Sequence, residues 1–173
     1  IFSTTNLGLK RRVSSGLDEV FDSEERAIVL EDDCVPHPDF FPYCAELIDR
    51  YRNNDRVWMI SGDNCHGLPV PPPDSYGFIS DPLVWGWATW ANRWERHDQS
   101  MGDWSEMRKT RNLRRVYPHP PHRFVRTRDF DTKISSSWAY PFTFSVNRAG
   151  GLCIVPAVNL VSNIGHGRDD AVH

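Results

Sequence analysis

The spacing of apolar residues predicts alternating helices and strands over the first sixty residues. Residues 9–21 place apolar side chains at helical spacing, with charged residues largely on the opposite face. The apolar run 27–30 is typical of a strand buried on both faces of a parallel sheet. A second helix is predicted at 40–51, after a candidate N-cap at Asp39, and a second buried strand at 57–61. This strand–helix–strand order predicts an α/β fold.

The second half of the chain is less regular. Four prolines within residues 68–73 predict a loop, and residues 76–80 have the pattern of an edge strand. Residues 107–137 show little periodicity and contain a proline-rich turn, so we expect a mobile basic loop there. A helix at 138–146 and a strong strand at 152–155 complete the pattern.

Composition bounds the domain organisation. The 173 residues suit a single domain, and 39% hydrophobic residues with seven Trp suffice for its core. No apolar run reaches the roughly 18 residues of a membrane-spanning helix, and the start lacks a signal-peptide pattern. We therefore expect one domain over residues 1–173, located in the cytoplasm. Residues 1–3 resemble the end of a strand, so further strands are expected to precede them.

Charge is distributed unevenly. The formal net charge is −3, yet residues 108–128 hold eight Lys or Arg and no acid. A compact basic stretch on an acidic body indicates a loop that faces anions or a patch that rests on the inner membrane, and argues against a general nucleic-acid binder. A solvated basic face explains the same stretch.

Three consecutive acids follow the first predicted strand. In open α/β sheets, ligands bind at the carboxyl ends of the strands, which is where Glu31, Asp32 and Asp33 are expected. Neighbouring carboxylates repel one another, and a hard divalent cation such as Mn²⁺ or Mg²⁺ relieves that repulsion. The alternative is a solvated acidic turn.

A second unusual feature is the run WGWATW at residues 85–90. Indole rings separated by small residues suit stacking on the apolar face of a sugar, so Trp85, Gly86 and Trp87 are candidates for sugar or acceptor binding. The alternative is a hydrophobic segment packed under a loop. Trp90 and Trp94, one helical turn apart, are expected in the core.

Several segments together resemble a known family. They are NLGL at 6–9, IVLEDDCVPHPDFF at 28–41, ISGDN at 60–64, WGWATW at 85–90 and the stretch 151–165. This combination resembles bacterial nucleotide-sugar glycosyltransferases of the GT-A fold, related to glycosyltransferase family 2, and the motif order is also similar to N-acetylglucosaminyltransferase I. The resemblance implies a GT-A sheet that is mixed and mostly parallel, with helices on both faces.

The resemblance also implies residue roles. Asp33 would bind a divalent metal that bridges the donor diphosphate, and Asp32 would contact the ribose or the sugar. His173 matches the late metal ligand of the family, with His166 as the alternative because the register is ambiguous. An imidazole ligand favours Mn²⁺ over Mg²⁺. The residues implied in donor binding are Asn6, Gly8, Lys10, Glu31 and Asp32.

One family position is altered. A Trp-Asp-Tyr segment supplies the general base in the family, and the matching residues here are Trp138, Ala139 and Tyr140. Loss of a general base removes about 10² to 10⁴ in rate. Four alternatives follow: the chain is slow, inactive or engineered, or another carboxylate such as Asp131 or Asp63 serves as the base.

Three functions follow as hypotheses. The first is a metal-dependent, inverting glycosyltransferase that uses a nucleoside-diphosphate sugar and a glycan, polysaccharide or lipid-linked acceptor. The second is a catalytically silent relative that binds sugar or nucleotide, which Ala139 favours. The third, a phosphoryl-transfer enzyme built on the acids, does not explain the tryptophans.

Overall fold

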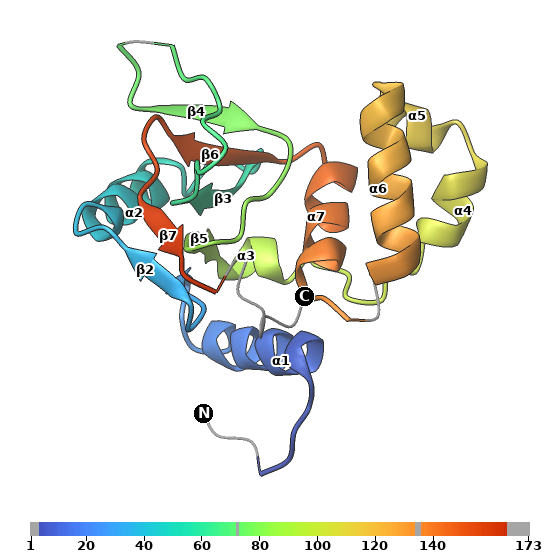
Figure 1. The fold of residues 1–173 in the computed structure, drawn as a ribbon. Helices are drawn as coiled ribbons and strands as arrows, with labels where there is room; N and C mark the ends of the chain where they lie inside the picture. The colour runs from blue at the N-terminus through green and yellow to red at the C-terminus, as the bar shows by residue number, and fades with distance from the viewer. Residues whose placement is uncertain (1–3, 72, 134–135, 166–173) are drawn as a thin grey trace.

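The computed structural model describes residues 4–71, 73–133 and 136–165. Its elements are arranged around one mixed sheet, with a group of helices at one end (Figure 1). The helices are α1 (Leu9–Phe21), α2 (Phe40–Arg50), α3 (Ala91–Trp94), α4 (Trp104–Lys109), α5 (Asn112–Val116), α6 (Pro120–Lys133) and α7 (Ala139–Arg148). The strands are β1 (Arg26–Val29), β2 (Cys34–Pro36), β3 (Val57–Ser61), β4 (Tyr76–Ile79), β5 (Trp87–Trp90), β6 (Leu152–Pro156) and β7 (Val161–Asn163).

The main sheet of the described residues is mixed but mostly antiparallel. Its strand order is β1-β5-β3-β6-β4, and only β3 and β6 pair in parallel. The prediction of a mostly parallel sheet is therefore wrong. β1 and β3 do share a direction, as the strand–helix–strand pattern implies, since both pair antiparallel with β5. The insertion of β5 between them is what separates the expected parallel neighbours.

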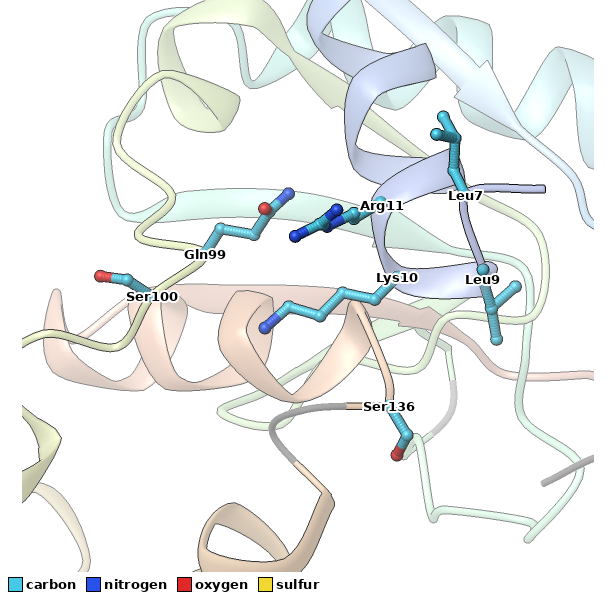
Figure 2. A pocket seen from close by; sticks show the side chains of 8 residues that line it. Leu7, Leu9, Lys10, Arg11, Gln99, Ser100 and Ser136 are labelled. Atoms are coloured by element: carbon cyan, nitrogen blue, oxygen red, sulfur yellow. The ribbon is translucent and has the colours of Figure 1, made fainter. Parts of the chain in front are cut away.

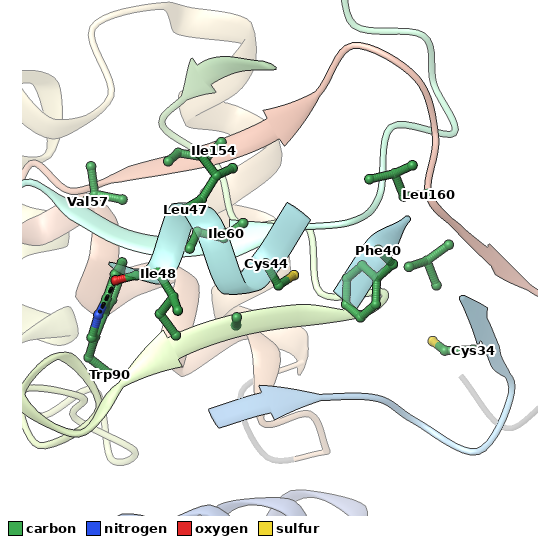
Figure 3. Packing of buried hydrophobic residues seen from close by; sticks show 12 residues of the cluster. Cys34, Phe40, Cys44, Leu47, Ile48, Val57, Ile60, Trp90, Ile154 and Leu160 are labelled. Atoms are coloured by element: carbon green, nitrogen blue, oxygen red, sulfur yellow. Dashed lines mark hydrogen bonds between the residues drawn. The ribbon is translucent and has the colours of Figure 1, made fainter. Parts of the chain in front are cut away.

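Helices cover both faces of the sheet, as predicted. On one face α2 packs on the central strands, and the indole N–H of Trp90 donates to the carbonyl of Ile48 at 3.0 Å (Figure 3). The apolar side chains of this layer are Phe40, Cys44, Leu47, Ile48, Val57, Ile60, Ala88 and Ile154. On the other face α1 and α7 contribute Leu17, Phe142 and Val146 to a second cluster with Trp58, Met59, Trp87, Trp94, Trp138 and Cys153.

The segment predicted as a basic loop is helical over most of its length. α4, α5 and α6 pack with α7 around a third apolar cluster. We refer to α4, α5 and α6 together with this cluster as the helical lobe. Its buried side chains are Met101, Trp104, Met107, Leu113, Tyr117, Phe130 and Phe144. The prediction of irregular structure over 107–137 is wrong. α4 and α5 are too short to show a clear period, and α6 is long but has few apolar residues, so it shows no clear apolar face. Pro120 occupies the first position of α6, where proline is tolerated, rather than a turn.

The strongest sequence patterns are confirmed. The helices at 9–21 and 40–51, the strands at 57–61 and 152–155, and an edge strand near 76–80 appear as α1, α2, β3, β6 and β4. The apolar run 27–30 does form a strand, but as β1 it lies at the sheet edge and is partly exposed. No described helix has the length and apolarity needed to span a bilayer.

Candidate functional site

The candidate site lies at the end of the sheet where the loop after β3, the approach to β5 and the start of β7 meet. The backbone N–H of Gly62 donates to the carbonyl of Gly86 at 2.8 Å, and the N–H of Leu160 donates to the carbonyl of Gly62 at 2.8 Å. Gly86 has φ +64°, and a Cβ there would overlap Val161 and lie 3.1 Å from Leu30. Gly86 therefore allows its backbone to lie close to the side chains of Val161 and Leu30, next to the acid motif. This packing gives Gly86 a structural role instead of the predicted contact with a sugar.

The acid motif, Glu31 to Asp33, leads from β1 into the small sheet formed by β2 and β7. These two strands pair antiparallel, so that Cys34 lies opposite Asn163. The N–H of Ile164 donates to the carbonyl of Asp33 at 2.9 Å. The chain that follows β7 is thereby placed against Asp33, although the two segments are far apart in the sequence.

The three acids have different surroundings. Asp32 is exposed, Asp33 is partly buried beside Gly165, and Glu31 is turned toward the core face. One Glu31 oxygen, Oε1, accepts a hydrogen bond from the indole N–H of Trp138 at 3.1 Å. Burial raises the pKa of Glu31, the Trp138 bond opposes that rise, and the nearby charges of Asp33 and Asp32 add to it. Repulsion within the acid motif therefore still acts on Glu31.

The acid motif carries oxygen donors, the ligand type that Mg²⁺ and Mn²⁺ prefer. Within the described ranges, no three His, Cys, Asp or Glu side chains form a group that could hold a metal ion. Mg²⁺ commonly binds through one or two carboxylates and keeps waters or substrate phosphates as its remaining ligands. Asp32 and Asp33 fit that pattern of oxygen donors. The predicted histidine ligands, His166 and His173, lie outside the described residues.

The tryptophans of residues 85–90 are mainly structural. Trp87 has no exposed surface and stacks on Trp138, with ring centroids 5.4 Å apart and planes 17° from parallel. Trp85 is partly buried and packs against the cluster under α2. The prediction that Trp87 forms a sugar platform is therefore wrong, because its ring faces lie within the core. Trp90 and Trp94 are buried, as predicted.

The structure places the candidate bases in three different environments. Ala139 is the first residue of α7 and directly follows Trp138, whose indole N–H reaches Glu31; the Ala139 side chain packs against the apolar cluster under α1 and α7. Asp131 lies in the helical lobe, where its Oδ1 accepts from Trp104 Nε1 at 3.0 Å and from Arg108 Nη1 at 2.9 Å. These bonds give Asp131 a structural role in that lobe.

Asp63 is the candidate base that is close to the sheet end. It follows β3 and is buried, and its Oδ1 accepts from the backbone N–H of Cys65 at 2.9 Å. The N–H of Asp63 is itself bonded to the Ser61 hydroxyl at 3.0 Å. Asp63 is thus held as a turn-forming carboxylate in the loop that supports Gly62.

A cavity of about 560 Å³ is lined in part by two of the residues implied in donor binding, Gly8 and Lys10. Asn6 supports it by accepting the Gly8 N–H on its side-chain oxygen at 2.9 Å. Lys10 and Arg11 extend from the start of α1 toward a loop that carries an amide and a hydroxyl group (Figure 2). Burial lowers the pKa of Lys10, and the charge of nearby Asp98 opposes that effect. The polar groups facing this cavity are those of Lys10, Arg11, Gln99, Ser100 and Ser136.

Sequence reasoning missed two features of this region. It did not identify Trp138 as the partner of Glu31, because the two residues lie 107 positions apart. It also missed Gln99, Ser100 and Ser136, which carry no motif and join the cavity only through folding. The adjacency of Trp138 to the altered position 139 was the one available signal.

Comparison with known proteins adds no family assignment. No protein-family model matches the chain, and no curated protein matches it.

Proposed function

We propose that this chain carries the acid motif of a metal-dependent, inverting glycosyltransferase with a GT-A-type fold. It would move a sugar from a nucleoside-diphosphate donor to a glycan, polysaccharide or lipid-linked acceptor. The observation that supports this most is the meeting of three segments at one sheet end. These are the acid motif, the chain beyond β7 and the segment that begins α7.

In this proposal Asp33 binds Mn²⁺ or Mg²⁺ and Asp32 reaches toward the donor. The cation would supply charge neutralisation of the leaving diphosphate. His173 lies eight residues beyond Gly165 in the sequence, and an extended chain of that length spans about 27 Å. That reach is sufficient for His173, or for His166 nearer by, to serve as the late ligand.

Positive charge for the phosphates is available from two places. Lys10 and Arg11 line the cavity at the start of α1, which suits the donor diphosphate. Exposed cations on the helical lobe, among them Lys109, Arg111 and Arg114, suit an acceptor that carries a lipid phosphate or a peripheral contact with anionic lipid.

A specific observation favours a second function, a sugar- or nucleotide-binding relative without transfer activity. Position 139 carries a methyl group where a base is expected, and both alternative carboxylates, Asp131 and Asp63, are engaged in structural hydrogen bonds. The chain would then bind a donor and leave it intact.

The substitution Ala139→Asp separates the two functions. It places a carboxylate next to Trp138, and a restored base is expected to raise sugar transfer or donor hydrolysis by about 10² to 10⁴. Ala157→Asp is the matched control, since it adds the same charge at a half-buried alanine after β6. A gain only in Ala139→Asp supports the enzyme. Metal-dependent nucleotide binding without any gain supports the binding relative.

A further inference from the structure

We propose that Trp138 is a positioning residue of the acid motif, which fixes the Glu31 side chain through its indole N–H. The inference rests on the proposed function, because it concerns how the carboxylates are presented to a cation. It follows from the hydrogen bond between Trp138 Nε1 and Glu31 Oε1 at 3.1 Å, and from the packing of the Trp138 ring.

The Trp138 indole is itself held in place. Its side chain is 2% exposed, and one ring face stacks on Trp87. Phe142, on the same side of the sheet, lies 5.2 Å from Trp87 and 6.4 Å from Trp138 between ring centroids. A ring enclosed on several sides has few alternative rotamers, so its N–H points in a fixed direction. The stacked rings therefore hold the Glu31 side chain in a fixed position relative to the sheet.

This arrangement divides the roles within the acid motif. The Trp138 bond occupies Oε1 of Glu31 and orients that carboxylate, so only its Oε2 remains beside the carboxylates of Asp32 and Asp33 for a cation. Groups that hydrogen-bond a ligating side chain commonly change metal affinity 10- to 100-fold when removed. Here the Trp138 bond acts on Glu31, the residue next to Asp32, and we expect an effect at the lower end of that range. Glu31 and Trp138 form such a support next to Asp32 and Asp33.

Other indole–carboxylate bonds in the described chain provide internal references. Trp94 Nε1 donates to Asp18 at 2.7 Å, and Trp104 Nε1 donates to Asp131 at 3.0 Å. Both are elsewhere in the fold, between α3 and α1 and within the helical lobe. A purely structural indole–carboxylate bond should behave as these do and have no influence on metal binding.

Two phenylalanine substitutions test the inference with Mn²⁺ alone as the probe. Trp138→Phe keeps an aromatic ring in the stack and removes the N–H that reaches Glu31. Trp87→Phe shortens the same stack, but the buried Nε1 of Trp87 has no hydrogen-bond partner among the residues described. In an electron paramagnetic resonance titration, Trp138→Phe should weaken Mn²⁺ binding by about 10-fold or more, and Trp87→Phe by less than about 3-fold.

Equal effects of the two substitutions, or unchanged affinity in Trp138→Phe, would overturn the inference. Absence of Mn²⁺ binding in the unsubstituted chain would contradict the proposed function itself, and the inference with it. Should Trp138→Phe fail to fold, the indole resonances of Glu31→Ala decide in its place. The Trp138 N–H signal should shift while those of Trp94 and Trp104 stay, and an unmoved Trp138 signal would refute the contact.

Discussion

Gly165 packs directly against the side chain of Asp33. A Cβ at position 165 would overlap the Asp33 carboxylate, and the neighbouring Ile164 N–H bonds the Asp33 carbonyl at 2.9 Å. Gly165, two residues after the end of β7, is therefore in contact with the residue proposed to bind the metal. Only glycine leaves room for this approach, which ties the geometry of the acid motif to a segment 132 positions later in the chain.

Gly165→Ala should disturb the site through this contact. The added methyl group must displace either Asp33 or the pairing of β2 with β7, and such overpacking costs about 1–3 kcal/mol. We expect lower stability in urea unfolding together with weaker Mn²⁺ binding. Gly102→Ala is the control, because a Cβ there meets only ordinary contacts at 3.5 and 3.6 Å. If Gly165→Ala behaved like Gly102→Ala in both measurements, the packing account would be wrong.

His97 should make stability depend on pH. Burial lowers the pKa of His97 to about 4, and the charges of Asp18 and Asp98 only partly oppose this. In the unfolded chain the pKa is about 6.5. Between these values the unfolded state binds more protons, so the His97 contribution is full above about pH 6.5 and is lost as the pH falls toward 4.

The size of this effect is about 2 kcal/mol between pH 7 and pH 5. Denaturant unfolding of the unsubstituted chain and of His97→Gln at both pH values measures it. Glutamine keeps a polar group near Ser145, the partner of His97 Nδ1 at 3.4 Å, and does not titrate in this range. The pH dependence should be smaller in His97→Gln by that amount, and an equal dependence in both proteins would exclude His97 as its source.

Removing the two basic side chains that line the cavity at the start of α1 should weaken binding of the nucleotide donor and leave Mn²⁺ binding unchanged. The double substitution Lys10→Ala, Arg11→Ala is expected to reduce affinity for a nucleoside diphosphate by roughly ten-fold, since charge-assisted hydrogen bonds to phosphate are lost. Mn²⁺ affinity should stay the same, because the acid motif is intact. The pair Lys109→Ala, Arg111→Ala removes equal charge from the helical lobe. Equal losses in the two double variants would indicate a general charge effect and not a site.

Local patterns in the sequence were sufficient for the elements that have strong periods. α1, α2, β3 and β6 follow from apolar spacing and flanking charge, because burial of one helix face or of a whole strand imposes that spacing. The short helices α4 and α5 could not be predicted in this way, since their anchors, Trp104 and Leu113, are held by tertiary contacts.

The sheet topology and the site depend on non-local contacts. The placement of β5 between β1 and β3 makes the sheet mostly antiparallel, and nothing in the run 27–30 distinguishes an edge strand from a central one. For the site, the acid motif and Ala139 were identified from the sequence, whereas the Glu31–Trp138 bond joins residues 107 positions apart. The tryptophans of residues 85–90 are unusual, as the sequence indicates, but the Trp87 ring is buried and packs in the core.

The most direct measurement is isothermal titration calorimetry of nucleoside diphosphates against the unsubstituted chain and Asp33→Asn, each with and without Mn²⁺. Asparagine preserves the shape of the Asp33 side chain beside Gly165 and removes its charge. Our account predicts that binding by the unsubstituted chain requires Mn²⁺ and that Asp33→Asn abolishes this metal-dependent binding. Nucleotide binding of equal strength in all four titrations would contradict it.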